Sequence, residues 1–239
     1  MANALQAKPV WLFDLDNTLH NASHQIFPRI NVAMTQFVSH KLNLSMDEAN
    51  EVRERFWRQY GATLLGLVKH HGIDMAEFLR EAHPFPDMHE IVSRHNMLIS
   101  ALRRLPGRKI LLTNAPRQYA ADVLHAMGIR NLFERVIAIE DMRFGGELQP
   151  KPDRRMMRRL AATLKVAPQQ CILVEDSVEN IRAARFVRMR SVLVLGYTFN
   201  SQANSNKSTR RRVRPRNRIH APDHQLQSAQ QLTRLSISL

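Results

Sequence analysis

Two aspartates stand two positions apart in the segment DLDNT, directly after a short apolar run. Asp14 ends the run PVWLFD, and Asp16 follows after a single leucine. Side chains two residues apart in extended backbone point the same way, so both carboxylates can converge on one site. Two adjacent carboxylates repel each other unless a proton or a cation lies between them. The pair therefore predicts acid–base chemistry or a metal site, against the alternative of a turn in which Asp16 only caps backbone groups.

Three further segments carry polar side chains of the kinds that bind phosphate or a divalent cation. Thr113 and Asn114 end the run KILLTN and offer a hydroxyl and an amide to phosphate oxygens. Lys151 lies between two prolines in QPKPD, which stiffen the backbone that carries its ammonium group. Glu175 and Asp176 end the run CILVED and supply the oxygen ligands that Mg²⁺ prefers. Each segment alone has an ordinary structural explanation, but together they predict one phosphate-and-metal site.

The elements that must position these residues are short apolar runs separated by helical segments. Five runs have the pattern of buried parallel strands, at residues 9–14, 109–114, 135–139, 171–176 and 191–195. Asp153 and Ser177 are expected to cap two of the intervening helices. Strands that alternate with helices predict an α/β fold, a Rossmann-like parallel sheet with helices on both faces. Open sheets of this kind bind ligands at the carboxyl ends of their strands.

An all-helical insertion is expected between the first and second strands, where no strand pattern occurs. Pro28 precedes an amphipathic helical pattern, and Ser45 with Glu48 forms a capping-box pair ahead of the next one. After the fifth strand, residues 224–235 have the pattern of a short strand or a terminal helix. The expected domains are an α/β core of residues 1–21 and 105–239 and a helical insertion of residues 22–104.

Composition and charge narrow the class of protein further. The 239 residues are 44% hydrophobic, no apolar run approaches the roughly 18 residues that span a bilayer, and no secretory signal pattern is present. The single cysteine, Cys171, permits no intramolecular disulfide, so a cytoplasmic location is expected. Residues 200–239 hold eight lysine or arginine residues and one acid. Their net charge of 8 − 1 = +7 is half of the chain's net charge of +14. Residues 199–221 are therefore expected to be a flexible basic segment.

Four motifs follow one another along the chain: DLDNT at 14–18, LLTN at 111–114, KPD at 151–153 and VEDS at 174–177. In this order they resemble the four motifs of the haloacid dehalogenase superfamily, over residues 11–195. The insertion resembles the helical C1-type cap of that superfamily. The segment YGATLLGLVKHHGIDMAEFL of the insertion, together with the later segment LRRLPGRKILLTNAP, is similar to sequences of the pyrimidine 5′-nucleotidase branch. The chain departs from the pattern at Arg188, where relatives commonly have glycine and a positive φ would cost an arginine free energy.

The resemblance implies a phosphomonoester hydrolase that depends on Mg²⁺ and works through an aspartyl-phosphate intermediate. Asp14 would be the nucleophile, and Asp16 would protonate the leaving alcohol and then deprotonate the hydrolytic water. Thr113 and Lys151 would neutralise the oxygens of the transferring phosphoryl group. Asn114 would contact the phosphate or the substrate.

The resemblance also implies a set of metal ligands. Mg²⁺ would be held by Asp14, the backbone carbonyl of Asp16 and Asp176, and Glu175 would join it directly or through water. Asn180 stands where relatives often place a residue that positions the lysine of the third motif.

The expected partner is a small phosphate ester, and the similarity to the pyrimidine branch favours a pyrimidine nucleoside 5′-monophosphate. Thr63, in the GATL loop of the insertion, is the candidate for a substrate contact there. Phosphatases of sugar or other metabolite phosphates, and phosphomutases, stay open as alternatives. Asp16 disfavours a dehalogenase, whose leaving group needs no acid. An RNA-associated regulatory protein that uses the basic residues 207–218 is the alternative from another class. No membrane partner is expected, and the oligomeric state is left open.

Overall fold

The computed structural model describes residues 8–197 and 221–235. The chain separates into two compact units: Met1–Ser23 with Val92–Leu239, called the sheet unit below, and His24–Ile91, called the helical unit. The basic residues 207–218 lie outside the described residues. No helix in the described part of the chain is both long and apolar enough to cross a membrane.

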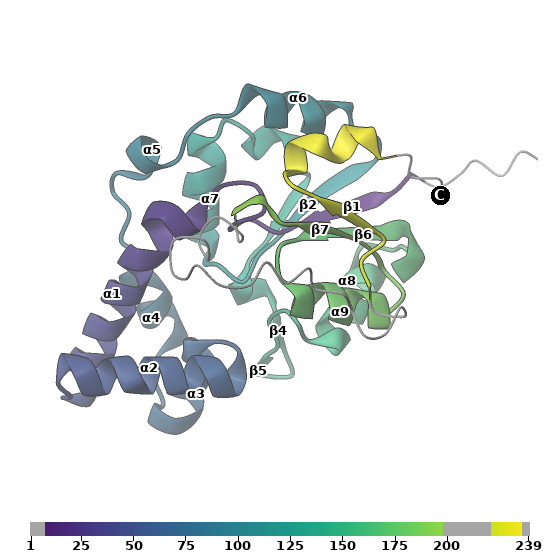
Figure 1. Cartoon of the computed structure of the whole chain (residues 1–239). Helices are drawn as coiled ribbons and strands as arrows, with labels where there is room; N and C mark the ends of the chain where they lie inside the picture. The colour runs from purple at the N-terminus through teal and green to yellow at the C-terminus, as the bar shows by residue number, and fades with distance from the viewer. Residues whose placement is uncertain (1–7, 198–220, 236–239) are drawn as a thin grey trace, which may run out of the picture. The chain divides into compact units, whose positions relative to one another are not determined.

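A sheet of six parallel strands forms the centre of the sheet unit, in the order β3-β2-β1-β6-β7-β8 (Figure 1). The strands are β1 (Val10–Phe13), β2 (Arg108–Leu112), β3 (Arg135–Ile137), β6 (Cys171–Glu175), β7 (Arg190–Val194) and β8 (His224–Leu226). The first five confirm the predicted strands. The expected terminal strand or helix is present as both, because β8 is followed by a 3₁₀ helix at Ala229–Arg234.

Helices cover both faces of this sheet. Successive side chains of a strand point to opposite faces. Leu12 and Leu173 pack with α8 (Arg154–Thr163) and α9 (Val178–Phe186) on one face. Figure 1 shows α6 (Asn96–Arg104) and the C-terminal 3₁₀ helix on the other face. The α/β fold with helices on both faces is therefore confirmed.

Two of the helices that follow strand ends or site residues, α8 and α9, begin at side-chain caps. Asp153 accepts hydrogen bonds from the backbone N–H groups of Arg155 and Met156 at the start of α8. Ser177 accepts one from Asn180 at the start of α9. Both predicted caps are confirmed. A third helix, α7 (Arg117–Ala126), follows β2 and begins after a proline.

A small hairpin that the sequence analysis did not predict lies between β3 and Lys151. Its strands β4 (Arg143–Phe144) and β5 (Glu147–Leu148) pair antiparallel. Gly145 and Gly146 join them with φ of 60° and 84°, as a two-residue hairpin turn requires.

The helical unit contains five helices: most of α1 (Ala22–Leu42), then α2 (Met46–Tyr60), α3 (Thr63–His71), α4 (Met75–Glu81) and α5 (Met88–Ile91). The capping box of Ser45 and Glu48 is confirmed at α2. The predicted start of the first helix at Pro28 was wrong, because α1 begins at Ala22 and Pro28 lies inside it. A proline there loses one backbone hydrogen bond, which the rest of a 21-residue helix tolerates.

The helical unit is shorter than the insertion expected at residues 22–104. It ends at Ile91, and α6 belongs to the sheet unit. Leu98 and Leu102 of α6 are fully buried there. Within the helical unit, α2 and α3 approach so closely that a β-carbon on Gly66 would lie 2.2 Å from the ring of Phe56.

Candidate active site

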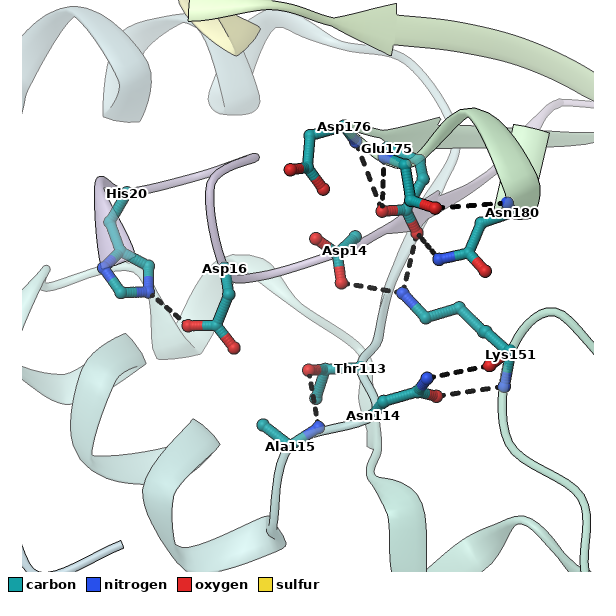
Figure 2. Close-up of polar contacts among 11 residues, drawn as sticks. Asp14, Asp16, His20, Thr113, Asn114, Ala115, Lys151, Glu175, Asp176 and Asn180 are labelled. Atoms are coloured by element: carbon teal, nitrogen blue, oxygen red, sulfur yellow. Dashed lines mark hydrogen bonds and ion pairs between the residues drawn. The ribbon is translucent and has the colours of Figure 1, made fainter. Parts of the chain in front are cut away.

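Apart from Thr63, the polar residues singled out in the sequence lie at one edge of the sheet, where three neighbouring strands end (Figure 2). Asp14 follows β1 and its N–H donates to the carbonyl of Val174 at 3.0 Å. Thr113 follows β2, and Glu175 ends β6. Chain connections run outward in opposite directions from β1 and β6, which lie side by side. Such a switch point is where open α/β sheets bind their ligands.

A buried lysine joins two of these strand ends. The Lys151 Nζ donates to Asp14 Oδ1 at 2.7 Å and to Glu175 Oε2 at 2.8 Å. Burial lowers the pKa of Lys151, but the charges of Asp14 and Glu175 outweigh it and raise the pKa above its ordinary value. The lysine is therefore a fixed positive charge beside the Asp14 carboxylate.

The surroundings of Asp14 raise the free energy needed to ionise its carboxyl group. Burial is the largest cause that raises its pKa from 3.8 to about 7, and the charges of Glu175 and Asp16 add to it while Lys151 opposes it. A positive charge close to Asp14 would favour the carboxylate, as a divalent cation does.

Glu175 uses both of its oxygens inside the protein. Oε2 accepts from Lys151 and from Nδ2 of Asn180 at 2.9 Å. Oε1 accepts from the backbone N–H groups of Asp176 and Ser177, both at 3.2 Å. Burial raises the pKa of Glu175, and the Lys151 charge opposes that rise. Asn180 and Lys151 therefore share Glu175 Oε2 as their hydrogen-bond acceptor.

Asn114 clamps the backbone of Lys151. Its Nδ2 donates to the Lys151 carbonyl at 2.9 Å, and its Oδ1 accepts from the Lys151 N–H at 3.0 Å. The neighbouring Thr113 hydroxyl accepts from the N–H of Ala115 at 3.0 Å. A hydroxyl that accepts still has its own hydrogen to donate to a phosphate oxygen.

Asp16 makes two contacts that the sequence analysis missed. Its Oδ1 lies 2.9 Å from Nε2 of His20 and accepts from the Tyr119 hydroxyl at 2.5 Å. His20 and Tyr119 are both buried. Burial and the charge of Asp16 raise the pKa of Tyr119 well above its ordinary value. A histidine four residues after Asp16 was a visible signal, but Tyr119 is 103 residues away in the chain and had none.

The cluster offers hard oxygen donors for a cation. Carboxylate oxygens of Asp14, Glu175 and Asp176 all lie within 4.8 Å of one another. This donor set fits Mg²⁺, which binds through one or two carboxylates and keeps several waters. Both oxygens of Glu175 already accept hydrogen bonds from protein donors.

Thr63 belongs to the helical unit, where it is buried at the start of α3. Its hydroxyl donates to the carbonyl of Arg53 at 3.0 Å. The hydroxyl hydrogen is thus engaged inside its own unit, and the expected substrate contact of Thr63 stays a prediction.

Known proteins share this fold and parts of this sequence. Phosphate metabolism protein 8 of Saccharomyces cerevisiae is 24% identical over 208 residues, which cover 82% of this chain and only 65% of the yeast protein. A phosphoglycolate phosphatase of Pseudomonas putida is 28% identical over 202 residues, 78% of this chain and 69% of that protein.

Solved structures agree in fold. A haloacid dehalogenase-type phosphatase from Thermococcus onnurineus has a TM-score of 0.58 at 19% identity. The match covers 95% of this chain and 96% of the Thermococcus chain. CbbY from Rhodobacter sphaeroides, solved in complex with phosphate, has a TM-score of 0.57 at 19% identity, covering 94% and 96%. The family model of the haloacid dehalogenase-like hydrolases matches residues 10–187. The chain therefore belongs to the haloacid dehalogenase-like hydrolases.

Proposed function

We propose that the protein is a Mg²⁺-dependent phosphomonoester hydrolase that works through an aspartyl-phosphate on Asp14. The observation that carries the proposal is the buried ammonium of Lys151, held 2.7 Å from Asp14, which precedes the hydrogen-bonded Asp16 by two residues. A carboxylate nucleophile, a fixed cation and a second carboxyl group are the parts that phosphoryl transfer needs.

The reaction divides into two steps. An oxygen of Asp14 attacks phosphorus while the bond to the ester oxygen breaks, and Asp16 gives its proton to the leaving alcohol. Water then attacks the phosphorus of the aspartyl-phosphate, Asp16 takes the proton of that water, and the bond to Asp14 breaks. Lys151 and the Thr113 hydroxyl stabilise the charge on the phosphoryl oxygens in both steps.

Asp14, Asp176 and the backbone carbonyl of Asp16 would hold the Mg²⁺ ion. When bound, the ion would offset the repulsion between the Asp14 carboxylate and the phosphate. Glu175 acts in this proposal by holding Lys151. Its four hydrogen bonds to protein groups support that role in place of direct metal binding.

The substrate class is proposed on the sequence. The similarity of the insertion to pyrimidine 5′-nucleotidases favours UMP and CMP, and we propose the helical unit as the cap that selects them. A small metabolite phosphate is the second candidate, because the Pseudomonas relative, 28% identical over 78% of this chain, is a phosphoglycolate phosphatase. The cytoplasmic location stays a prediction from the single cysteine.

The test is phosphate release with Mg²⁺ from UMP, CMP, AMP, IMP, 2-phosphoglycolate and a sugar phosphate. We expect turnover that EDTA abolishes, with the pyrimidine nucleotides hydrolysed fastest. Much faster hydrolysis of 2-phosphoglycolate or the sugar phosphate would reject the nucleotide assignment and keep the phosphatase.

Asp14→Asn should lower kcat at least about 10³-fold, because an amide cannot form the acyl phosphate. The partly exposed Asp122 on α7 bonds Gln118, and Asp122→Asn is the matched control that should keep wild-type kcat. Full activity of Asp14→Asn would reject the mechanism.

A further inference from the structure

The carboxyl group of Asp16 is held through one of its two oxygens. Oδ1 receives the Tyr119 hydroxyl at 2.5 Å and contacts Nε2 of His20 at 2.9 Å. No hydrogen bond from the described residues reaches Oδ2. In Figure 2 this second oxygen points away from His20. The two oxygens of Asp16 are therefore chemically distinct before any substrate binds.

Both partners of Oδ1 are held in place by the fold. His20 is 4% exposed, and its backbone forms an isolated bridge with that of Asp16. Asn17 between them adopts φ of 59° and bonds through its side chain to the N–H and the hydroxyl of Ser23, at 3.0 and 2.9 Å. Tyr119 is 3% exposed in α7. All of these residues belong to the sheet unit.

We infer that Tyr119 and His20 are positioning residues that keep the transferable proton of Asp16 on Oδ2. We take Nε2 of His20 as the protonated ring nitrogen, so that Oδ1 accepts from both His20 and Tyr119 and has no lone pair left for a proton. The protonated form then carries its hydrogen on Oδ2, and two hydrogen bonds fix the rotation of the group. The inference rests on the proposed function, because it concerns the step in which Asp16 protonates the leaving alcohol.

This role makes the effect of Tyr119 depend on the leaving group. An alkoxide is a poor leaving group and needs the proton of Asp16 as the ester bond breaks. A nitrophenolate leaves without protonation, because its charge is delocalised over the ring. Loss of the Tyr119 hydroxyl should therefore slow alkyl phosphates and spare aryl phosphates, whereas a general loss of structure would slow both.

The experiment compares kcat/KM for UMP or glycerol 2-phosphate with that for p-nitrophenyl phosphate. This constant reports the steps up to loss of the leaving group, so the shared hydrolysis of the aspartyl-phosphate does not enter. In Tyr119→Phe we expect a fall of about 10-fold or more for the alkyl esters, part of the 10²–10⁴ that general acids supply, and less than about 3-fold for the aryl ester. His20→Ala should shift the ratio in the same direction, and His20→Gln, which keeps an N–H donor, should restore part of it.

The matched control is Gln118→Ala, which changes the exposed residue next to Tyr119 on α7, whose amide bonds Asp122. It should leave the alkyl-to-aryl ratio unchanged. Equal loss for both ester classes in Tyr119→Phe, or no loss for either, would overturn the inference. Failure of the wild-type protein to hydrolyse even p-nitrophenyl phosphate with Mg²⁺ would instead reject the proposed function.

Discussion

Lys151 is fixed at both ends of its side chain. Its ammonium is held by Asp14 and Glu175, and its backbone is held on both sides by the amide of Asn114. A lysine side chain has several rotatable bonds, so the position of its charge depends on such anchors. Asn114 therefore has a positioning role in the proposed reaction, in which one N–H and one lone pair of its amide bind the backbone of Lys151.

Replacement of Asn114 by alanine should lower kcat about 10-fold and leave KM within a factor of about 3, because a misplaced charge weakens mainly the transition state. The loss of two backbone hydrogen bonds should also cost about 1–3 kcal/mol of unfolding free energy. Steady-state kinetics and denaturant unfolding measure the two effects. Gln118→Ala is the control, because it removes an exposed amide that among the described residues bonds only Asp122. This variant should change neither kcat nor the unfolding free energy. An unchanged kcat in Asn114→Ala would contradict the positioning role.

At the scale of residues, the sequence predicts which side chains lie together at the site, but it does not predict their hydrogen-bond partners. Asp14, Thr113 and Glu175 follow from strand ends, because parallel strands end at the same edge of a sheet. The amide of Asn114 was expected to face substrate, yet it meets a backbone 37 residues away. Tyr119 was overlooked because the direction of a helical side chain depends on how its helix packs.

At the scale of elements, the turn from α9 into β7 contains the departure noted in the sequence. Arg188 has φ of 67°, in the left-handed region that glycine adopts without steric cost. The N–H of Met189 after it donates back to the carbonyl of Ala184, as at a helix end that glycine usually terminates. The arginine is exposed, and its side chain therefore offers little packing in return.

Arg188→Gly should raise the unfolding free energy by about 0.5–1 kcal/mol, because relief of the left-handed strain exceeds the added freedom of the unfolded chain. Arg188→Ala keeps the β-carbon and should show no such gain. Denaturant titration of both variants measures the difference, and phosphatase activity should stay at the wild-type level. Equal stability of the glycine and alanine variants would show that the turn carries no strain.

Elements with strong local signals were predictable from the sequence. The apolar runs gave five strands, and Asp153 and Ser177 gave two helix starts. The hairpin Arg143–Leu148 escaped prediction because strands of two residues have no periodicity, although Gly145-Gly146 was a turn signal. The sequence misplaces the start of α1, because proline is common in the first turn of a helix and Pro28 lies well inside this one.

At the scale of the whole molecule, the two units differ in what they bury. The helical unit encloses apolar side chains, with the rings of Phe37 and Phe78 packed edge to face at 5.2 Å. The sheet unit buries Asp14, Glu175 and Lys151, a cluster with a net charge of −1 when all three are ionised. Removing such charges from water costs free energy even when an ammonium lies between the carboxylates. The proposed active site should therefore destabilise the metal-free protein.

The direction in which the stability of the folded protein changes with pH follows from the pKa of Asp14. The folded protein holds the proton of this carboxyl up to about pH 7, whereas the unfolded chain releases it near pH 3.8. The folded state thus binds more protons between these values, and the stability from this group falls as pH rises. The contribution is full below pH 3.8 and is lost above about pH 7. Glu175, whose pKa is also raised, acts in the same direction.

Thermal unfolding in EDTA at pH 5, 6, 7 and 8 should therefore show Asp14→Asn gaining stability over the wild-type protein as pH rises. The difference at pH 8 should be on the order of 1 kcal/mol or more, since one pKa unit corresponds to about 1.4 kcal/mol. Asp122→Asn should follow the wild-type curve at every pH. Added Mg²⁺ at pH 8 should raise the unfolding midpoint of the wild-type protein more than that of Asp14→Asn, because in the proposed site the ion would bind the Asp14 carboxylate only in the folded state. Parallel curves for wild type and Asp14→Asn from pH 5 to 8 would show that the Asp14 carboxyl ionises without cost in the fold. The lysine at 2.7 Å would then fully offset its burial.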